Sequence, residues 1–559
     1  CHHHRHRIAP LVAFVSAVSC GVAMVQHLAE VVDGETEEAI GTPIARLRAM
    51  SRDSASSSPG GSGHDLDINN LRARLLPEKR KMSVDGEFEG DGEVDDASDE
   101  EGPPPLTWKD VLWYMGPGWM VAIAYVDPGN YQADISSGKL TAYSQNWVIL
   151  WTSLLSIYIQ VLCVRLAQRS RQTLSQAIAE EYPRFVRYTL YAVAEFTVMI
   201  TDLPEVIGFG FAVKLFLGWP IWVGVILSLV TTMLFLSSQH YGFRVLEFII
   251  MCFVGVMSVA IFYEWGVSKG DSVAFLKGAF LPGLSGIPPD YLTVLGIIGC
   301  VVMPHNLYLH SAAAMTRGDV QRTEKYVNRA ILLCSLDIVL PVLVTVAINY
   351  GIVSLAARSL YKNPDAEKAG IGDFCQYFVG LKGGCVMWGI ALLAAAQSSA
   401  ITTTYAGQYV MDGFLNLKMA MWKRAILTRV TAIGPSVIVA VMYDAAALQF
   451  MIDLVNAALA LLLPFALIPL VKFNTSRRKM GKYASKRTES IILWIMTAAV
   501  VVVNIISLKL DLKGRSQGFN FHREITKALP LNMLLVLYVC ILSYIALEPV
   551  KGKQAQALR

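Results

Sequence analysis

Two short motifs carry the residues best suited to chemistry, and each interrupts an apolar segment. The first is DPGN at 127–130, inside an apolar stretch from about 111 to 135. The second is MPHN at 303–306, inside a stretch from about 291 to 315. Together they offer a carboxylate, amides, a thioether and an imidazole. These are side chains that ligate metal ions, so the two motifs predict a metal site.

Each motif also places a proline in the middle of a segment long enough to cross a bilayer. Proline removes a backbone donor and clashes with the preceding turn, so a helix tends to break there. At membrane depth a broken helix must be buried in protein or line a watery cavity. Two such breaks in comparable places predict two halves of a transporter that meet around a central site.

The composition agrees with a membrane protein. Of the 559 residues, 54% are hydrophobic and only 16% are charged, whereas soluble domains carry about 25% charged residues. The net charge of +4 implies no nucleic-acid partner. The nine cysteines form no CxxC pair, so neither a disulfide framework nor a zinc module is indicated. Cys375 and Cys385 lie in one loop, and a paired and an unpaired state are both consistent with the sequence.

The apolar blocks predict an all-α, polytopic membrane protein with about twelve transmembrane helices. The candidate spans are 111–135, 146–167, 188–216, 219–237, 244–266, 291–315, 326–353, 385–414, 424–443, 447–472, 489–509 and 529–547. The breaks fall in spans one and six, which predicts a 5+5 inverted repeat with the site at the midplane. Residues 108–473 would form the transporter core, and residues 474–559 two peripheral spans and a tail.

The N-terminal region, residues 1–107, has a different composition. Most of it is rich in Ser, Gly, Asp, Glu and Pro, and the run 85–101 is strongly acidic. Such a segment buries too little apolar surface to offset its ordering entropy, so we expect it to be mostly disordered. The apolar stretch 8–25 follows a basic opening and resembles a signal peptide or anchor. An incidental apolar stretch in a disordered tail is an equally good interpretation.

Basic loops set the expected orientation. Lys and Arg gather in the loops after spans two, six and ten, which lie on one side and should be cytoplasmic. The loop after span eleven is also basic and does not follow this pattern, so the orientation is predicted from the other loops. Both termini are then predicted to be cytoplasmic. The sequon at 474–476 falls in a cytoplasmic loop, so we expect no glycan at Asn474.

Several stretches resemble the natural resistance-associated macrophage protein (Nramp) family. They are GPGWMVAIAYVDPGNYQADI at 116–135, TDLPEVIG at 201–208, VMPHNLYLHSA at 302–312, QSSAITTTYAGQYVMDGFL at 397–415 and LPFALIPL at 463–470. The resemblance covers about 108–473 and is looser beyond. It implies a proton-coupled divalent-metal transporter with a LeuT-like fold.

The residues themselves indicate which metals would bind. Asp127 is an ionisable group inside a span and is a functional-site candidate by default. Asn130 is suited either to capping the half-helix or to ligating a cation, and Met303 either to packing or to ligating. A thioether favours ions softer than Ca²⁺ and Mg²⁺. The set therefore predicts Mn²⁺ or Fe²⁺ as the substrate, with Co²⁺ and Cd²⁺ tolerated, and no resident cofactor.

The resemblance adds three ligands to this set: the backbone carbonyls of Ala124 and Cys300, and the side chain of Asn456. Cys300 departs from the alanine that is common in the family. If its sulfur faces the ion, the site becomes softer and favours Cd²⁺, Zn²⁺ or copper. A small buried thiol packed against a neighbouring helix is the better interpretation.

A proton route is the other expectation. Histidine titrates near neutral pH, and the resemblance assigns His305 and His310 to proton handling, although His310 would equally well be a hydrogen-bonded core residue. Acids recur on one face of span three, which is costly in a membrane unless they line a polar route. Pro204 sits among them and could displace Glu205. The predicted route comprises Asp127, His305, His310, Glu195, Asp202 and Glu205, with Arg424 and Arg429 as counter-charges.

These observations favour a proton-coupled secondary transporter of divalent metals, whose partners are metal ions, protons and the lipid bilayer. An uncoupled metal channel or facilitator would share the ligands, and a non-transporting metal sensor would use the N-terminal region as output. No nucleophile with a base, phosphate loop or cofactor motif stands out, so an enzyme is not expected. The plasma membrane and an endosomal or vacuolar membrane are both consistent with the sequence.

Overall fold

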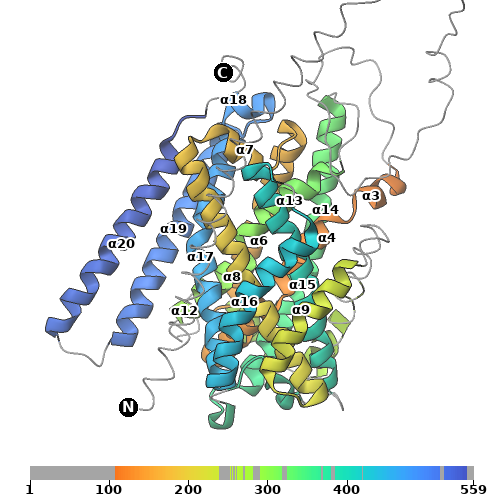
Figure 1. Ribbon diagram of the computed structural model, residues 1–559, viewed down its shortest axis with the longest axis vertical. Helices are drawn as coiled ribbons and strands as arrows, with labels where there is room; N and C mark the ends of the chain where they lie inside the picture. The colour runs from red at the N-terminus through yellow and green to blue at the C-terminus, as the bar shows by residue number, and fades with distance from the viewer. Residues whose placement is uncertain are drawn as a thin grey trace, which may run out of the picture. The chain divides into compact units, whose positions relative to one another are not determined.

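The computed structural model describes residues 107–237, 271–280, 290–317, 324–366, 369–378, 384–417, 419–516 and 521–550, with isolated residues and one short stretch between 252 and 267. These residues form helices and no strand (Figure 1). The N-terminal region, with its predicted anchor and acidic run, lies outside them.

The first span is broken where the proline predicted a break. It consists of α4 (Pro117–Ala122), the 3₁₀ turn η2 (Ile123–Val126) and α5 (Pro128–Thr141). Asp127 interrupts the helix with an extended backbone, φ −81° and ψ 169°. Pro128 then opens α5 at its first position, where the missing N–H has no helical partner to lose.

The sixth span breaks in the same way. Helix α12 (Tyr291–Val301) ends before Met303, and α13 (Pro304–Met315) starts with a proline at its first position. In both spans the helix after the break is therefore led by a proline. The predicted breaks in spans one and six are confirmed.

The other described helices match the remaining predicted spans. Eight helical segments are long and apolar enough to cross a membrane, counted over the described residues alone. Residues 238–250, within and before the fifth predicted span, lie outside the description. The long helices are α6 (Asn146–Ser170), α8 (Arg184–Leu217), α9 (Ile221–Ser237), α14 (Glu324–Ser359), α15 (Gly384–Leu415), α16 (Met421–Met442), α17 (Ala445–Thr475), α19 (Arg487–Ser516) and α20 (Phe521–Leu547).

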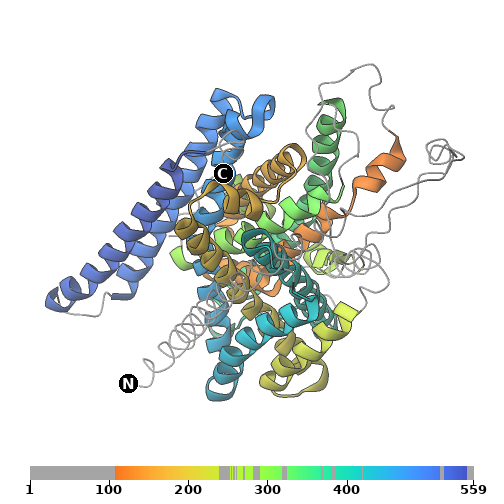
Figure 2. The ribbon, with the colours of Figure 1, turned by 45° about the horizontal axis from the view of Figure 1, so that its top comes forward.

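Helices α19 and α20 lie along one flank of the bundle (Figure 1). Both contact α17. The same two blue helices stay on one side when the molecule is turned (Figure 2). Lys472 of α17 also donates to Ile545 O of α20 at 2.8 Å.

The segment between α14 and α15 packs back onto the bundle. A disulfide joins Cys375, in the 3₁₀ turn η5 (Phe374–Tyr377), to Cys385 at the start of α15. Near it, the Ile371 N–H donates to Gln132 Oε1 of α5 at 3.2 Å. Trp388 Nε1 donates to Ile371 O at 2.8 Å. Of the two states that the sequence left open for this cysteine pair, the structure has the bonded one.

Candidate metal site and its polar connections

Asp127 and Asn130 form the centre of the site. Asp127 Oδ1 accepts the Asn130 backbone N–H at 2.7 Å, so Asp127 is the residue that caps α5. The capping role considered for Asn130 is thus taken by its neighbour. Both side chains are only 1% exposed. The site is held inside the protein by local turn geometry.

The Asn130 side chain gathers three oxygen atoms around one point. Its Nδ2 donates to Asp127 Oδ1 at 2.7 Å, to Ala124 O at 2.9 Å and to Cys300 O at 3.1 Å. Two of these are backbone carbonyls freed by the breaks in the first and sixth spans. Oxygens that converge on an N–H donor can converge equally on a cation. The structure therefore brings these predicted ligands together.

Asn456 of α17 completes the ring of oxygens. Its Nδ2 donates to Gly129 O at 2.8 Å. A Cβ built on Gly129 would lie 2.9 Å from Asn456 Oδ1 and 3.3 Å from both Asp127 carboxylate oxygens. Only glycine leaves this space open. Among the described residues, three buried oxygens at the site accept no hydrogen bond: Asp127 Oδ2, Asn130 Oδ1 and Asn456 Oδ1.

The two sulfur-bearing residues differ in what surrounds them. Met303 is 1% exposed and caps the second half of the sixth span, directly at the break. The Cys300 thiol is buried and donates to Ile297 O of its own helix at 3.5 Å. A thiol turned to its own helix fits the interpretation of Cys300 as a packed residue whose carbonyl faces the site.

On one side of the site a network of hydrogen bonds links the first, second and sixth spans. His310 Nδ1 donates to Gln160 Oε1 at 2.8 Å, and Gln160 Nε2 donates to Tyr125 OH at 3.2 Å. Tyr125 OH lies 2.6 Å from Ser156 Oγ. His310 is therefore a hydrogen-bonded buried histidine, one of the two roles the sequence left open. These bonds tie η2, next to the site, to α6 and α13.

On the opposite side the segment before η5 covers α5. Besides the Ile371 bond to Gln132, Lys139 Nζ donates to Ala369 O at 2.8 Å. Gln132 Nε2 and Ser136 Oγ also face Asp453 of α17, each at 3.4 Å. Helix α5 is thus tied to the segment before η5 and to α17.

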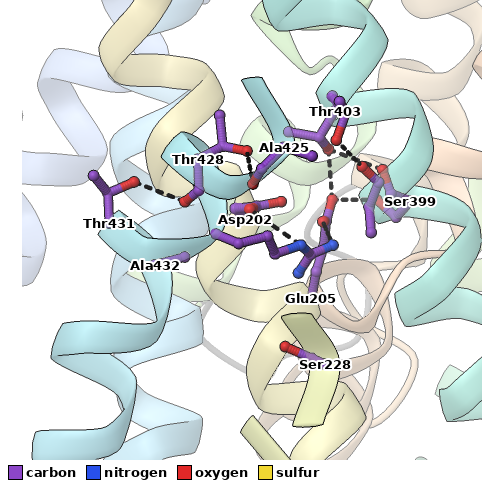
Figure 3. A network of polar contacts seen from close by, with 12 residues as sticks. Asp202, Glu205, Ser228, Ser399, Thr403, Ala425, Thr428, Thr431 and Ala432 are labelled. Atoms are coloured by element: carbon purple, nitrogen blue, oxygen red, sulfur yellow. Dashed lines mark hydrogen bonds and ion pairs between the residues drawn. The ribbon is translucent and has the colours of Figure 1, made fainter. Parts of the chain in front are cut away.

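The acids of α8 lie beside the site and are paired with arginines. Arg429 of α16 contacts Asp202 at 3.4 Å and Glu205 at 3.2 Å (Figure 3). Glu205 also accepts from Ser399 and Thr403 of α15, each at 2.6 Å. Pro204 lies inside α8, which continues without interruption to Leu217, so Glu205 is not displaced from the polar network. The predicted counter-charge for these two acids is in place.

Seven residues before Asp202 in α8, Glu195 forms an ion pair with Arg424, and both side chains are fully buried. Near the site, His305 Nδ1 lies 3.4 Å from Thr201 Oγ1, the residue before Asp202. His305 thus contacts α8 at the residue next to Asp202. The proton-handling roles of these residues stay a prediction.

Sequence reasoning missed the neutral partners in these networks. They are Tyr125, Gln132, Ser156, Gln160, Ser399 and Thr403. A hydroxyl or amide inside an apolar span is a weak signal, because Ser and Thr commonly satisfy themselves on the preceding turn, as Thr403 does with Ser399 O at 3.0 Å. No group of three His, Cys, Asp or Glu side chains suited to a metal occurs in the described chain. A search restricted to those four residue types would overlook an Asp, Asn, Met and carbonyl site.

Two broken helices whose break points meet in a buried polar site, within a bundle of membrane-length helices, are typical of a membrane transporter with a LeuT-like fold. The model for the family described as "Natural resistance-associated macrophage protein-like" matches residues 118–509. The chain therefore belongs to the Nramp family.

Individual relatives agree with this assignment. The chain is 37% identical over 415 residues to "Metal transporter Nramp1" of Populus trichocarpa, covering 72% of this chain and 76% of the relative. It is 34% identical over 443 residues to "Metal transporter Nramp4" of Arabidopsis thaliana, covering 77% and 85%. A crystal structure of a mutant of the Eremococcus coleocola manganese transporter superposes with a TM-score of 0.72 at 25% identity, covering 80% of this chain and 97% of that one.

Proposed function

We propose that this protein carries Mn²⁺ or Fe²⁺ across a membrane together with protons, by alternating access to the site at Asp127. Membership of the Nramp family and the metal-transporter names of its relatives support divalent-metal transport. The observation that carries the proposal is the convergence of Asp127 Oδ1, Ala124 O and Cys300 O on the Asn130 amide. No enzymatic activity belongs to this proposal.

In this proposal the Asn130 amide holds the place of the cation. Its two Nδ2–H donors are shared among the three converging oxygens while no metal is bound. When a dication enters, the amide turns, so that Oδ1 joins the ligands and the N–H groups leave the centre. Asp127 Oδ2, Asn456 Oδ1 and the Met303 sulfur supply the remaining positions. A mixed set of this kind suits Mn²⁺ and Fe²⁺ better than the all-oxygen sets of Ca²⁺ and Mg²⁺.

The direct test is metal flux into proteoliposomes containing the purified protein. Uptake of Mn²⁺, Fe²⁺, Cd²⁺ and Mg²⁺ is measured with and without an inward proton gradient, with internal acidification recorded in parallel. We expect Mn²⁺ and Fe²⁺ uptake that rises with the gradient and is accompanied by acidification. Uptake that is independent of the proton gradient would instead identify an uncoupled facilitator.

Met303→Ala is expected to change selectivity. The thioether gives its advantage mainly to soft ions, whereas the Asp127 and Asn130 oxygens serve every dication. Cd²⁺ uptake should fall by about tenfold or more, Mn²⁺ uptake should fall much less, and Ca²⁺ or Mg²⁺ should begin to compete. Competition assays with each ion measure this, and Met315→Ala, a buried methionine at the end of the same helix, is the matched control. Equal losses for Cd²⁺ and Mn²⁺ would remove Met303 from the ligand set.

We further propose that both termini face the cytoplasm and that the segment between α14 and α15 faces the outside or lumen of a plasma, endosomal or vacuolar membrane. The disulfide between Cys375 and Cys385 supports this, because such bonds persist in oxidising compartments. We expect no glycan at Asn474 in this orientation. Its side chain is buried in the folded protein and donates to Leu470 O at 2.9 Å, so only the nascent chain could receive one.

Thiol labelling supplies the orientation test. Cells with the protein at their surface are treated with a membrane-impermeant reductant and then with an impermeant maleimide. We expect two additional labelled thiols, which disappear in the double variant Cys375→Ser, Cys385→Ser. Labelling that occurs only after the membrane is permeabilised would reverse the proposed topology.

A further inference from the structure

A second carboxylate on α5 lies deep in the protein and has no partner among the described residues. Asp134 is 2% exposed, and its Oδ2 accepts no hydrogen bond within the described part of the chain. The ion pairs formed among the described residues do not include it. It stands seven residues beyond Asp127, about 10 Å along a helix. An isolated buried carboxylate is costly, so something must compensate it.

Two further oxygens without partners share its surroundings. Ser137 lies one turn further on the same face of α5, is fully buried, and its Oγ has no hydrogen-bond partner in the described chain. Asn349 of α14 is 1% exposed, and its Oδ1 is likewise unmatched there. Oxygens from two helices are therefore available beside Asp134.

Helix packing places Asn349 opposite Asp134. One turn further along each helix, Gly138 of α5 meets α14 so closely that an added Cβ would lie 2.6 Å from Val353 O. Gly138 and Val353 are the i+4 neighbours of Asp134 and Asn349, so the same helix faces meet one turn earlier. The α5–α14 interface thus holds a carboxylate and an amide oxygen, neither of them satisfied.

Asn146, at the start of α6, offers a fourth oxygen. The phenol of Tyr350, the residue after Asn349, donates to Asn146 O at 3.2 Å, so the start of α6 lies against this part of α14. The Asn146 side chain is fully buried, and neither Oδ1 nor Nδ2 has a hydrogen-bond partner among the described residues.

We infer that Asp134, Ser137, Asn146 and Asn349 form a second cation site, for a monovalent ion of the size of Na⁺. The set contains hard oxygens only, with no sulfur or imidazole, which disfavours transition metals. It carries one negative charge, which a single positive charge neutralises, whereas a dication would leave a net charge in the interior. This site is separate from the one at Asp127, whose set includes Met303 and Asn456.

The two sites are close enough to influence each other. Asp134 stands seven residues from Asp127, about 10 Å along a helix, and charges at that separation in a buried environment influence each other. When its own site is empty, the Asp134 carboxylate attracts a dication toward Asp127; when Na⁺ is bound, that attraction is cancelled. Na⁺ should therefore weaken Mn²⁺ binding, and Mn²⁺ should weaken Na⁺ binding by the same factor. This second expectation rests on the proposed function.

The first test is independent of metal transport. Binding of ²²Na⁺ to the purified protein in detergent is measured without any transition metal, for wild type and for Asp134→Asn and Asn349→Ala. We expect saturable binding by the wild type and its loss in both variants. Asp453→Asn removes a neighbouring carboxylate that is hydrogen-bonded to Gln132 and Ser136, and it should bind ²²Na⁺ normally. Thermal melting and gel filtration verify that each variant is folded.

Three results would overturn the inference: no saturable ²²Na⁺ binding by the wild type, equal binding by Asp134→Asn, or equal loss in Asp453→Asn. The pocket would then hold water or a protonated carboxyl group. In transport, replacing choline by Na⁺ should lower the apparent affinity for Mn²⁺ by about tenfold. Asp134→Asn should abolish that dependence. Failure of Mn²⁺ transport altogether would contradict the proposed function but would leave the ²²Na⁺ result standing.

Discussion

Replacing Asp127 with alanine is expected to abolish metal uptake, with a loss of more than about 100-fold, because even residues outside the first ligand shell are worth about 10- to 100-fold. Asp127 carries the charge within the proposed ligand set, and the other ligands are neutral amides, carbonyls and a thioether. A buried dication needs that charge to offset its lost hydration. The measurement is Mn²⁺ uptake into proteoliposomes at equal protein content.

The matched variant is Asp127→Asn. Asp127 also caps α5, and an alanine at a helix cap costs about 1 kcal/mol of stability. Asparagine caps a helix as well as aspartate does, so this variant removes the charge and keeps the cap. We expect it to fold and melt as the wild type does and still to lose uptake. If Asp127→Asn transported Mn²⁺ at half the wild-type rate or better, Asp127 would be a structural cap and the site would lie elsewhere.

The sequence was sufficient to predict the breaks in the first and sixth spans and the elements around them. A proline at 128 and another at 304 act locally, through a missing N–H and a fixed φ, so their effect does not depend on distant packing. The apolar length that a span needs is set by the thickness of the bilayer, so it can be recognised in each segment separately. Both kinds of prediction therefore held for the part of the chain that the structure describes.

Contacts between distant segments could not be predicted in the same way. Gln160 joins Tyr125 to His310 only because three helices from different parts of the chain pack together. The closure of α5 by Ile371 depends on how a long connection folds back. Asp134 gave no signal of its own, because its lack of a partner becomes visible only when the neighbouring helices are in place. Residue type and spacing along one helix do not contain this information.

Resemblance to a family filled part of that gap. Nothing in the spacing alone singled out Ala124 O, Cys300 O or Asn456 of α17. The structure places the two carbonyls on the Asn130 amide and Asn456 beside Gly129. Their ligand roles stay a prediction until metal binding is measured.

Asp202 and Glu205 differ in how well they are satisfied, and this difference predicts their roles. Glu205 accepts from Ser399, Thr403 and Arg429. Neither carboxylate oxygen of Asp202 has a hydrogen-bond partner in the described chain, and its contact with Arg429 is longer, at 3.4 Å. Protonating Glu205 would disturb a network that joins α8 to α15 and α16, whereas Asp202 has fewer contacts to lose. Asp202 is therefore the expected acceptor of a proton displaced from Asp127.

Asp202→Asn should leave metal uptake partly intact and weaken its dependence on external pH. A dication arriving at Asp127 expels any proton held there, and His305, through Thr201, leads toward Asp202. With asparagine at this position the proton has no acceptor, so uptake at acid external pH should fall toward its value at neutral pH. Internal acidification should fall with it. Both are recorded in one proteoliposome experiment at several external pH values.

The companion variant Glu205→Gln separates coupling from structure. It disrupts a three-donor network and leaves Arg429 with a weaker partner, so we expect a lower melting temperature and less folded protein. Asp202→Asn should instead melt close to the wild type, because Asp202 contributes fewer hydrogen bonds. If Asp202→Asn kept the wild-type proton flux and pH dependence, the acids of α8 would be structural. Metal would then cross without protons, and an uncoupled facilitator built on the same ligands would be the better account.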